Sequence, residues 1–157
     1  ITPIVSFNYG MRNKKRVKDG IRYGLLYTII LMVIGLIVIE VFAKPLTGFF
    51  ALSDTTFDLC VDCMRIVSAA FIFAGLNIAL QGVFQALECG IESLIISIGR
   101  QVLFILPVAW IFVQVIDGVT NVSLVWWTFL IGESITLISG VLMYIRVSNN
   151  KINKLEG

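Results

Sequence analysis

Residues 25–43 read LLYTIILMVIGLIVIEVFA, a run in which only Glu40 carries a charge. The rest of the chain has a similar character: 58% of its residues are hydrophobic, 14% are charged, and the mean hydropathy is +0.95. A soluble domain carries about 25% charged residues. This chain therefore has too little polar surface to cover itself in water, and we expect an all-α polytopic membrane protein.

Four segments of the chain are candidates for crossing a membrane. They are residues 21–43, 64–87, 93–116 and 125–147. A helix of about 23 residues is roughly 35 Å long, enough to cross a hydrocarbon core of about 30 Å with some tilt. Backbone groups in lipid must pair within their own segment, and these runs lack turn clusters, so we expect helices. Lys44-Pro45 should end the first segment, and Asp117-Gly118 should end the third.

Lysine and arginine are distributed unequally between the two ends of these segments. If the basic stretch at residues 10–20 is a cytoplasmic loop, ten of the twelve Lys and Arg residues lie on the cytoplasmic side. Only Lys44 and Arg65 then lie outside. This excess follows the positive-inside rule. We expect a protein integral to a plasma membrane of the prokaryotic type, with this loop and the C-terminus in the cytoplasm.

The remaining segments are expected to lie before, between or after the four spans of the transmembrane portion at residues 21–147. Residues 1–9 are apolar and begin with Ile rather than Met, which suggests the end of a preceding transmembrane helix. Residues 44–63 are amphipathic and interrupted, so we expect them to lie along the outer surface. Residues 148–157 are polar, and we expect a solvated, partly disordered cytoplasmic tail.

Two ionisable residues, Arg100 and Glu133, fall deep within the predicted spans. Such a group costs roughly 2–4 kcal/mol on insertion scales, so each is a functional candidate. Glu133 could carry a proton or cation or contact a substrate. Alternatively, the two residues form a buried polar pair, or the side chain of Arg100 extends to the inner surface.

Three amides recur every fourth residue in the second span: Asn77, Gln81 and Gln85. This spacing places them along one helical face. They could line a water-filled substrate cavity, or they could form hydrogen bonds that hold the helices together. In the third span, Pro107 removes one backbone bond, and we expect it to kink the helix.

Several kinds of chemistry are disfavoured by residue content. The chain contains no histidine, which removes imidazole metal sites and histidine general bases. Cys60 and Cys63 form one C-x-x-C, which could be a redox or metal motif, but no second pair accompanies it. We expect no enzyme activity, no metal site and no organic cofactor.

Residues 2–24 read TPIVSFNYGMRNKKRVKDGIRYG, in which Pro-Ile-Val-x-x-Asn-x-Gly precedes a basic stretch. This pattern resembles a cytoplasmic junction of the multidrug and toxic compound extrusion (MATE) family of transporters. ALQGVFQALECGIESLIISIGRQVLFILPVAWIF (residues 79–112) resembles the family's tenth and eleventh helices. VWWTFLIGESITLISGVLMYIR (residues 125–146) resembles the twelfth, where a Trp precedes a polar or acidic residue.

The resemblance implies a twelve-helix transporter of two six-helix lobes, of which this chain is the end of helix eight and helices nine to twelve. Partners would then be the lipid bilayer, small amphiphilic or cationic substrates and the missing N-terminal lobe, with no nucleic acid. Some members carry a cation-binding carboxylate on the tenth helix. The apparent equivalent here, around Ala74, has no acid. The resemblance therefore implies that the site for the coupling ion, Na+ or H+, lies outside this chain.

The leading hypothesis is a cation-coupled secondary antiporter that exports amphiphilic drugs or toxic compounds by alternating access. One alternative is a flippase for lipid-linked saccharides from the same superfamily. Such a protein would favour more basic residues in its cavity than the single Arg100. Another alternative is a non-transporting membrane subunit that serves as a scaffold for partners.

Overall fold

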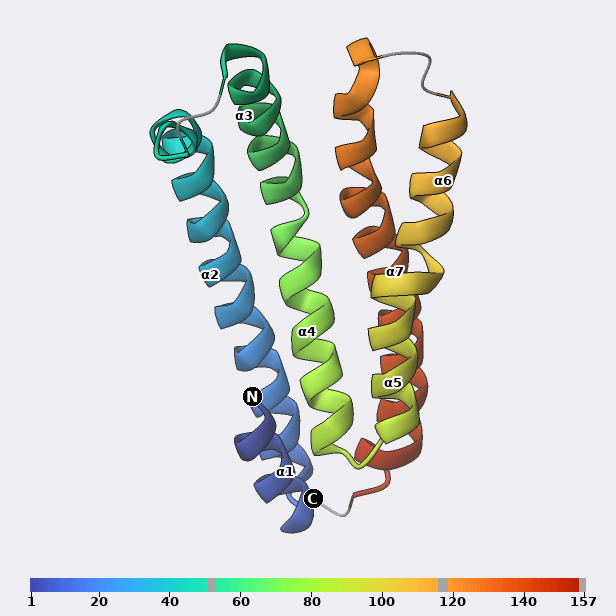
Figure 1. Cartoon of the computed structure of the whole chain (residues 1–157). Coiled ribbons are helices and arrows are strands. Elements are labelled where there is room, and N and C mark those ends of the chain that lie inside the picture. The colour runs from blue at the N-terminus through green and yellow to red at the C-terminus, as the bar shows by residue number, and fades with distance from the viewer. Residues whose placement is uncertain (51–52, 116–118, 156–157) are drawn as a thin grey trace.

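A computed structural model describes residues 1–50, 53–115 and 119–155, and these residues contain helices and turns but no β-strand. The α-helices are α1 (Thr2–Gly10), α2 (Lys14–Gly48), α3 (Asp54–Ala69), α4 (Phe71–Ala86), α5 (Gly90–Ile98), α6 (Ile105–Val115) and α7 (Trp127–Val147). Shorter segments are the π-helical η1 (Gly99–Leu103) and η3 (Ser148–Ile152) and the 3-10 helix η2 (Val119–Trp126). The long helices run side by side as one elongated bundle (Figure 1).

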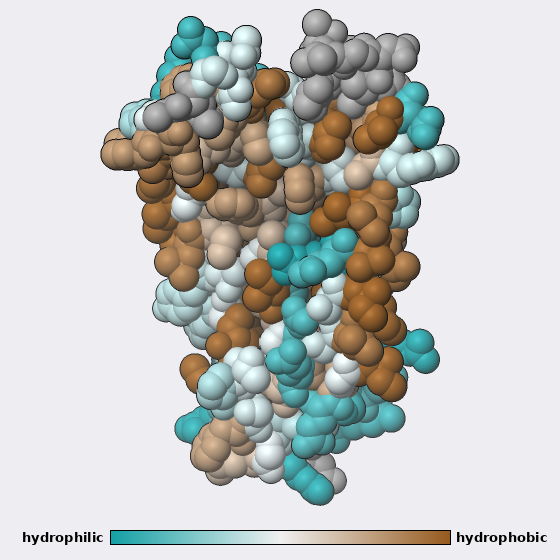
Figure 2. Space-filling model, in the orientation of Figure 1, coloured by the Kyte–Doolittle hydropathy of each residue, from teal (hydrophilic) through white to brown (hydrophobic). Residues whose placement is uncertain are grey.

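Membrane-spanning length is reached several times within the described residues. The stretches Lys14–Gly48, Gly90–Gln114 and Ser123–Ile152 are each long and apolar enough, and α3 with α4 adds a fourth if this bent pair counts as one span. Large hydrophobic side chains point outward, including Leu31 and Val41 on α2, each 65% exposed. Hydrophobic residues cover the flanks of the bundle, whereas hydrophilic residues gather at both ends (Figure 2). The prediction of an all-α polytopic membrane protein is confirmed.

The first long helix, α2, extends beyond both limits predicted for it. The predicted loop at residues 10–20 is helical from Lys14 onward, because the Asn13 side chain caps the helix by accepting from the Arg16 amide at 3.0 Å. Lys and Arg are also good helix formers. At the other end, α2 continues past Pro45 to Gly48. Pro45 lacks one backbone donor, but its fixed φ is compatible with a helix, and α2 ends three residues later instead of at Lys44-Pro45.

Residues 54–63 do not lie apart from the helices, as the sequence suggested, but form the first part of α3. This helix packs along α2 and α7 and buries Val61. The chain then bends by 44° at Ala70 into α4. Next to the bend, the Ser68 hydroxyl donates to the Arg65 carbonyl at 2.8 Å, a bond that competes with the helix backbone and favours bending.

The third span is interrupted in its middle. Between α5 and α6, the amide of Phe104 donates to the carbonyl of Gly99 at 3.1 Å, five residues back, in the π-helical segment η1. Pro107 lies just beyond, lacks an N–H for the carbonyl of Leu103, and crowds that carbonyl with its ring. Figure 1 shows α6 leaning away from the line of α5. The predicted boundary at residues 116–118 lies outside the described residues.

Small residues on α7 let neighbouring helices approach closely. Gly132, Thr136 and Gly140 are all buried. A Cβ placed on Gly132 would lie 2.8 Å from Ile105 of α6, and one on Gly140 would lie 3.2 Å from Ile96 of α5. A stripe of small residues four apart is a common packing surface between membrane helices.

The C-terminal segment packs against the bundle through residue 155, which corrects the prediction of a solvated tail. The side chain of Ile152 is completely buried and belongs to the same hydrophobic cluster as Phe84 and Leu87 of the α4 end. The Nζ of Lys151 donates to the carbonyls of Leu87 at 2.7 Å and Glu88 at 3.2 Å. The polar composition of residues 148–157 predicted disorder, because composition alone does not show that the Ile152 side chain is buried against the bundle.

Replacement of Ile152 by alanine should therefore destabilise the chain by about 2–4 kcal/mol, since it removes a buried side chain and leaves a cavity. Thermal unfolding of the purified protein in detergent measures the effect. Ile145→Ala is the matched control, because Ile145 is 52% exposed on α7 and contributes little to the protein core. Equal melting temperatures for the two variants would show that the segment does not pack as described.

Candidate functional site

The most polar site inside the bundle surrounds the carboxylate of Glu133 on α7. The side chain of Glu133 is only 7% exposed. One carboxylate oxygen, Oε1, accepts from Nε of Arg100 in η1 at 2.7 Å. The other, Oε2, accepts from Nδ2 of Asn77 on α4 at 2.7 Å, and Nδ2 also donates to the Glu133 backbone carbonyl at 2.9 Å. Three segments that are distant in sequence therefore meet at one carboxylate.

Local backbone structure helps to position each partner of Glu133. Arg100 is in the wider turn of η1, and π-helical turns of this kind are frequent at functional sites. Asn77 is fully buried on the face of α4 that packs against α7. Gly132, directly before Glu133, allows α6 and η1 to approach α7. The pairing of Arg100 with Glu133, one of the possibilities left open by the sequence, is the arrangement present.

The electrostatics of this cluster are nearly balanced. Removing a carboxylate from water is expensive, and the cost is offset only if a cation and hydrogen-bond donors replace the lost water. Arg100 supplies the charge and Asn77 supplies two hydrogen bonds. Within the described part of the chain, Asn77 Oδ1 and the Thr128 hydroxyl are buried without a hydrogen-bond partner. Asn77 Oδ1 is thus an unused hydrogen-bond acceptor beside the ion pair.

A cavity of about 340 Å³ opens beside the ion pair. Its lining combines the charged pair with Gln101 and with the apolar side chains of Ile105 and Phe129. Arg100, 23% exposed, faces this space more than Glu133 does. A cavity that offers a carboxylate, a guanidinium and apolar walls is suited to a molecule with both charged and apolar parts.

The three amides of α4 do not act together as their spacing suggested. Asn77 is held by Glu133, but Gln81 is half-buried and makes no side-chain hydrogen bond to the described residues. Gln85 is exposed and donates to the Ser93 hydroxyl of α5 at 3.2 Å. Figure 2 shows hydrophilic groups along a line through the middle of this face, between α4 and α5. Within the described residues, the Gln81 amide is therefore available for another partner, whereas Gln85 links α4 to α5.

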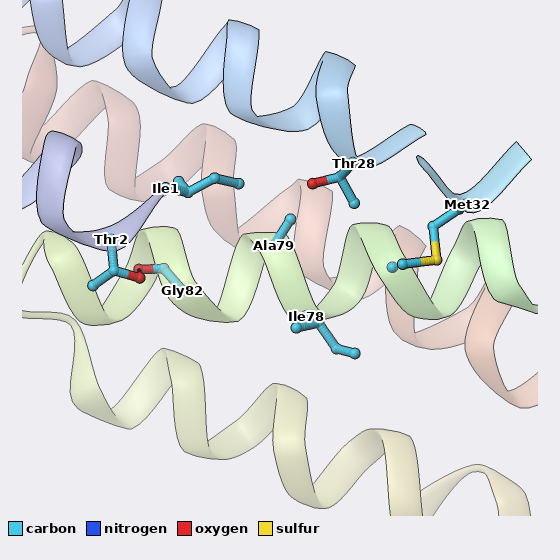
Figure 3. Close-up of a pocket in the computed structure, with 8 residues that line it drawn as sticks. Ile1, Thr2, Thr28, Met32, Ile78, Ala79 and Gly82 are labelled. Carbon is cyan, nitrogen blue, oxygen red and sulfur yellow. Dashed lines mark hydrogen bonds between the residues drawn. The ribbon is translucent and has the colours of Figure 1, made fainter. Parts of the chain in front are cut away.

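A second cavity, which sequence reasoning missed, lies between α1, α2 and α4. It has a volume of about 300 Å³ and no titratable side chain in its lining. Figure 3 shows Thr28 and Met32 of α2 on one side of this space and Ala79 of α4 pointing toward them. The absence of a side chain at Gly75 leaves room for Met32, since a Cβ there would clash with it. Gly75, a glycine within an apolar helix, was the one sequence feature that could have indicated this cavity.

Glu40, toward the C-terminal end of α2, forms a second ion pair that the sequence did not predict. Glu40 lies 3.7 Å from Arg65 and accepts from the Ser68 hydroxyl at 3.3 Å. Both charged side chains are more than two-fifths exposed, so this pair is worth at most about 1 kcal/mol. This pair is exposed, whereas the pair of Glu133 and Arg100 is buried. A substitution at Glu40 can therefore serve as the control for the same substitution at Glu133.

The cysteines do not form a reactive site in the described residues. Cys60 and Cys63 are free thiols, half-buried on α3. Burial raises the pKa of Cys89 in the turn between α4 and α5, although the nearby ammonium of Lys151 opposes this effect. A raised pKa keeps the thiol protonated and weakly nucleophilic. No group of three or more His, Cys, Asp or Glu side chains that could hold a metal occurs in the described ranges.

Comparison with known proteins gives the same relatives by sequence and by structure. Multidrug export protein MepA of Staphylococcus aureus strain N315 is 24% identical over 143 residues, which cover 91% of this chain and 30% of MepA. The protein of the same name from Staphylococcus saprophyticus is 22% identical over 161 residues, covering 100% of this chain and 34% of the relative. The chain thus spans about a third of the length of these curated relatives.

Two solved structures share the fold. An inward-facing multidrug resistance MATE family transporter of the MOP superfamily superposes with a TM-score of 0.87, at 21% identity, over 99% of this chain and 36% of that one. A MATE protein in complex with MaL6 gives a TM-score of 0.85, at 22% identity, over 98% of this chain and 34% of that one. The family model described as MatE matches residues 1–111, well over half of the sequence. The chain therefore belongs to the MatE family.

Proposed function

We propose that this chain is most of one lobe of a membrane transporter that exports amphiphilic, often cationic compounds in exchange for Na+ or H+. Membership of the MatE family supports the general class, as do relatives named as multidrug export proteins. The observation that carries the proposal is the buried Glu133 carboxylate, held by Arg100 and Asn77 beside a cavity with apolar walls. A buried charge within membrane helices is a functional candidate by default.

The geometry suggests how a cationic amphiphile would be recognised. Its apolar part would contact Ile105 and Phe129, and its positive charge would approach the carboxylate of Glu133. That approach competes with Arg100, which is partly exposed and can turn toward cavity water. Exchange of one cation partner for another would give the site two arrangements, and substrate binding would favour one of them. A ligand shifts a transporter between its two conformations only through such a difference in affinity.

The coupling-ion site belongs, in this proposal, to another part of the transporter. Arg100 already balances the charge of Glu133 at 2.7 Å. An amphiphilic cation that displaces Arg100 also gains apolar contacts with Ile105 and Phe129, which a bare ion does not. Gln81 and Gln85 are proposed as additional cavity-lining residues on α4. A lipid-linked saccharide is a weaker candidate substrate, because its pyrophosphate would meet a carboxylate in this cavity beside one arginine.

Separate removal of Glu133 and Arg100 tests whether the cluster serves stability or transport. Glu133→Gln or Arg100→Met alone should lower the free energy of unfolding by about 3 kcal/mol, because each leaves one partner charge uncompensated. The double variant should recover most of that loss while still failing to export a cationic dye. Unfolding in detergent and dye efflux from cells expressing the complete transporter are the two measurements.

Glu40→Gln is the matched control for this experiment, since it makes the same change in an exposed ion pair and should cost less than about 1 kcal/mol. Normal export by the double variant would confine Glu133 and Arg100 to a structural role and contradict the proposed mechanism.

Replacement of Gln81 by leucine tests the amide surface of α4. The substitution should reduce dye export several-fold without reducing the amount of protein in the membrane, because it removes a polar group from the proposed cavity and leaves the protein core intact. Gln114→Leu, the same change at an exposed position near the end of α6, should leave export unchanged. If both variants export the dye as well as the parent protein does, Gln81 does not line the substrate cavity.

A further inference from the structure

A third cavity lies at the end of the bundle where most of the basic residues gather, away from the Glu133 site. It has a volume of about 480 Å³ and forms where the turn after α1, the turn after α4 and the C-terminal segment meet. Its charged and polar lining includes Arg12, Glu88, Asn150, Lys151 and Lys154. Three cationic side chains and one carboxylate thus face the same space, and this excess of positive charge favours the binding of an anion.

The backbone at two of these residues is unusual. Arg12 and Glu88 have φ angles of 55° and 57°, and they are the non-glycine residues with positive φ among those that the structure describes. Each follows a helix and stands at the position where glycine is strongly preferred, because a Cβ is unfavourable in the left-handed conformation. Both of these residues line the cavity.

Hydrogen bonds show that both residues end their helices in the same way. After α1, the Arg12 amide donates to the Tyr9 carbonyl at 3.0 Å and the Asn13 amide to the Asn8 carbonyl at 3.0 Å. After α4, the amides of Glu88 and Cys89 make the equivalent bonds, at 3.1 and 2.8 Å. This pair of bonds is the Schellman motif, which normally ends in glycine. A charged side chain in place of glycine at both turns indicates a use for those side chains.

The C-terminal wall of the cavity is fixed by other lysines. Lys14 and Lys18 of α2 donate to Asn153, to its backbone carbonyl at 2.9 Å and its side-chain oxygen at 2.8 Å. Lys151 holds the carbonyls of Leu87 and Glu88. By contrast, the side chains of Arg12 and Lys154 make no hydrogen bond to any residue in the described ranges. The cavity is therefore held open with cationic donors still available.

We infer that this cavity binds the phosphate of an anionic phospholipid headgroup. A guanidinium and an ammonium are the donors that phosphate oxygens favour, and charge-assisted bonds to them are strong. The cavity lies at the end of membrane-spanning helices, at the level where headgroups are found. Met11, 62% exposed, directly precedes Arg12, and Ile91, 73% exposed, lies shortly after Glu88. These exposed side chains near the two turns offer apolar contact for acyl chains.

The inference is tested by titrating the full chain with phosphatidylglycerol in a neutral phosphatidylcholine nanodisc and counting bound lipids by native mass spectrometry. Arg12→Gln should weaken phosphatidylglycerol binding about tenfold, because it removes the free guanidinium from the cavity. Arg16→Gln is the matched control, since it removes the same charge from an exposed position at the same end of the bundle but outside the cavity. Glu88→Gln should tighten binding about threefold by removing the opposing carboxylate.

Loss of binding must be separated from loss of folding. Arg12→Gly provides this control, because glycine relieves the left-handed strain and should leave the melting temperature unchanged or higher, while still weakening lipid binding. Equal weakening by Arg12→Gln and Arg16→Gln would show only a general surface charge effect and would overturn the inference. Inorganic phosphate binding as tightly as the lipid would assign the cavity to soluble anions and overturn the lipid assignment.

Discussion

Surrounded by hydrocarbon, a backbone N–H or C=O without a partner costs several kcal/mol, and the rest of this structure follows from that constraint. Helices satisfy it locally, which explains why the described residues contain no strand. Where the ladder is disturbed, another donor or acceptor compensates. The Gly99 carbonyl accepts from Phe104 in the π-helical turn, and Ser68 donates to Arg65 beside the bend at Ala70.

The same constraint acts more strongly on charged side chains. Glu133 can be buried because a guanidinium and an amide replace the water that it lost, and those groups come from η1 and α4. The cluster therefore links three segments of the chain while leaving one side open to a cavity. Glu40 and Arg65 show the contrast, since an exposed pair of the same chemistry needs no such arrangement. Burial, rather than residue type, distinguishes the candidate site from an ordinary surface ion pair.

Glycine is used differently in the interior of the bundle and at the ends of two of its helices. At Gly132 and Gly75, the missing side chain makes room for Ile105 and Met32, so neighbouring segments approach closely. At the ends of α1 and α4, the chain carries Arg12 and Glu88 where glycine would be more favourable. Close packing in the bundle interior thus depends on glycines that are present, whereas the basic end carries charged residues at positions that favour glycine.

Much of the fold could be predicted from the sequence, because helix formation in lipid depends on composition over about twenty neighbouring residues. The apolar run at residues 25–43 and the family resemblance both led to helical spans, and Arg100 and Glu133 were recognisable as unusual. Their pairing was one of several possibilities, and the sequence could not choose among them. The partners of Glu133 are 33 and 56 residues away along the chain, so helix packing decided which of the amides reaches it. The docking of Ile152 and the shape of the basic cavity were likewise decided by tertiary structure, because each depends on surfaces that only packing brings together.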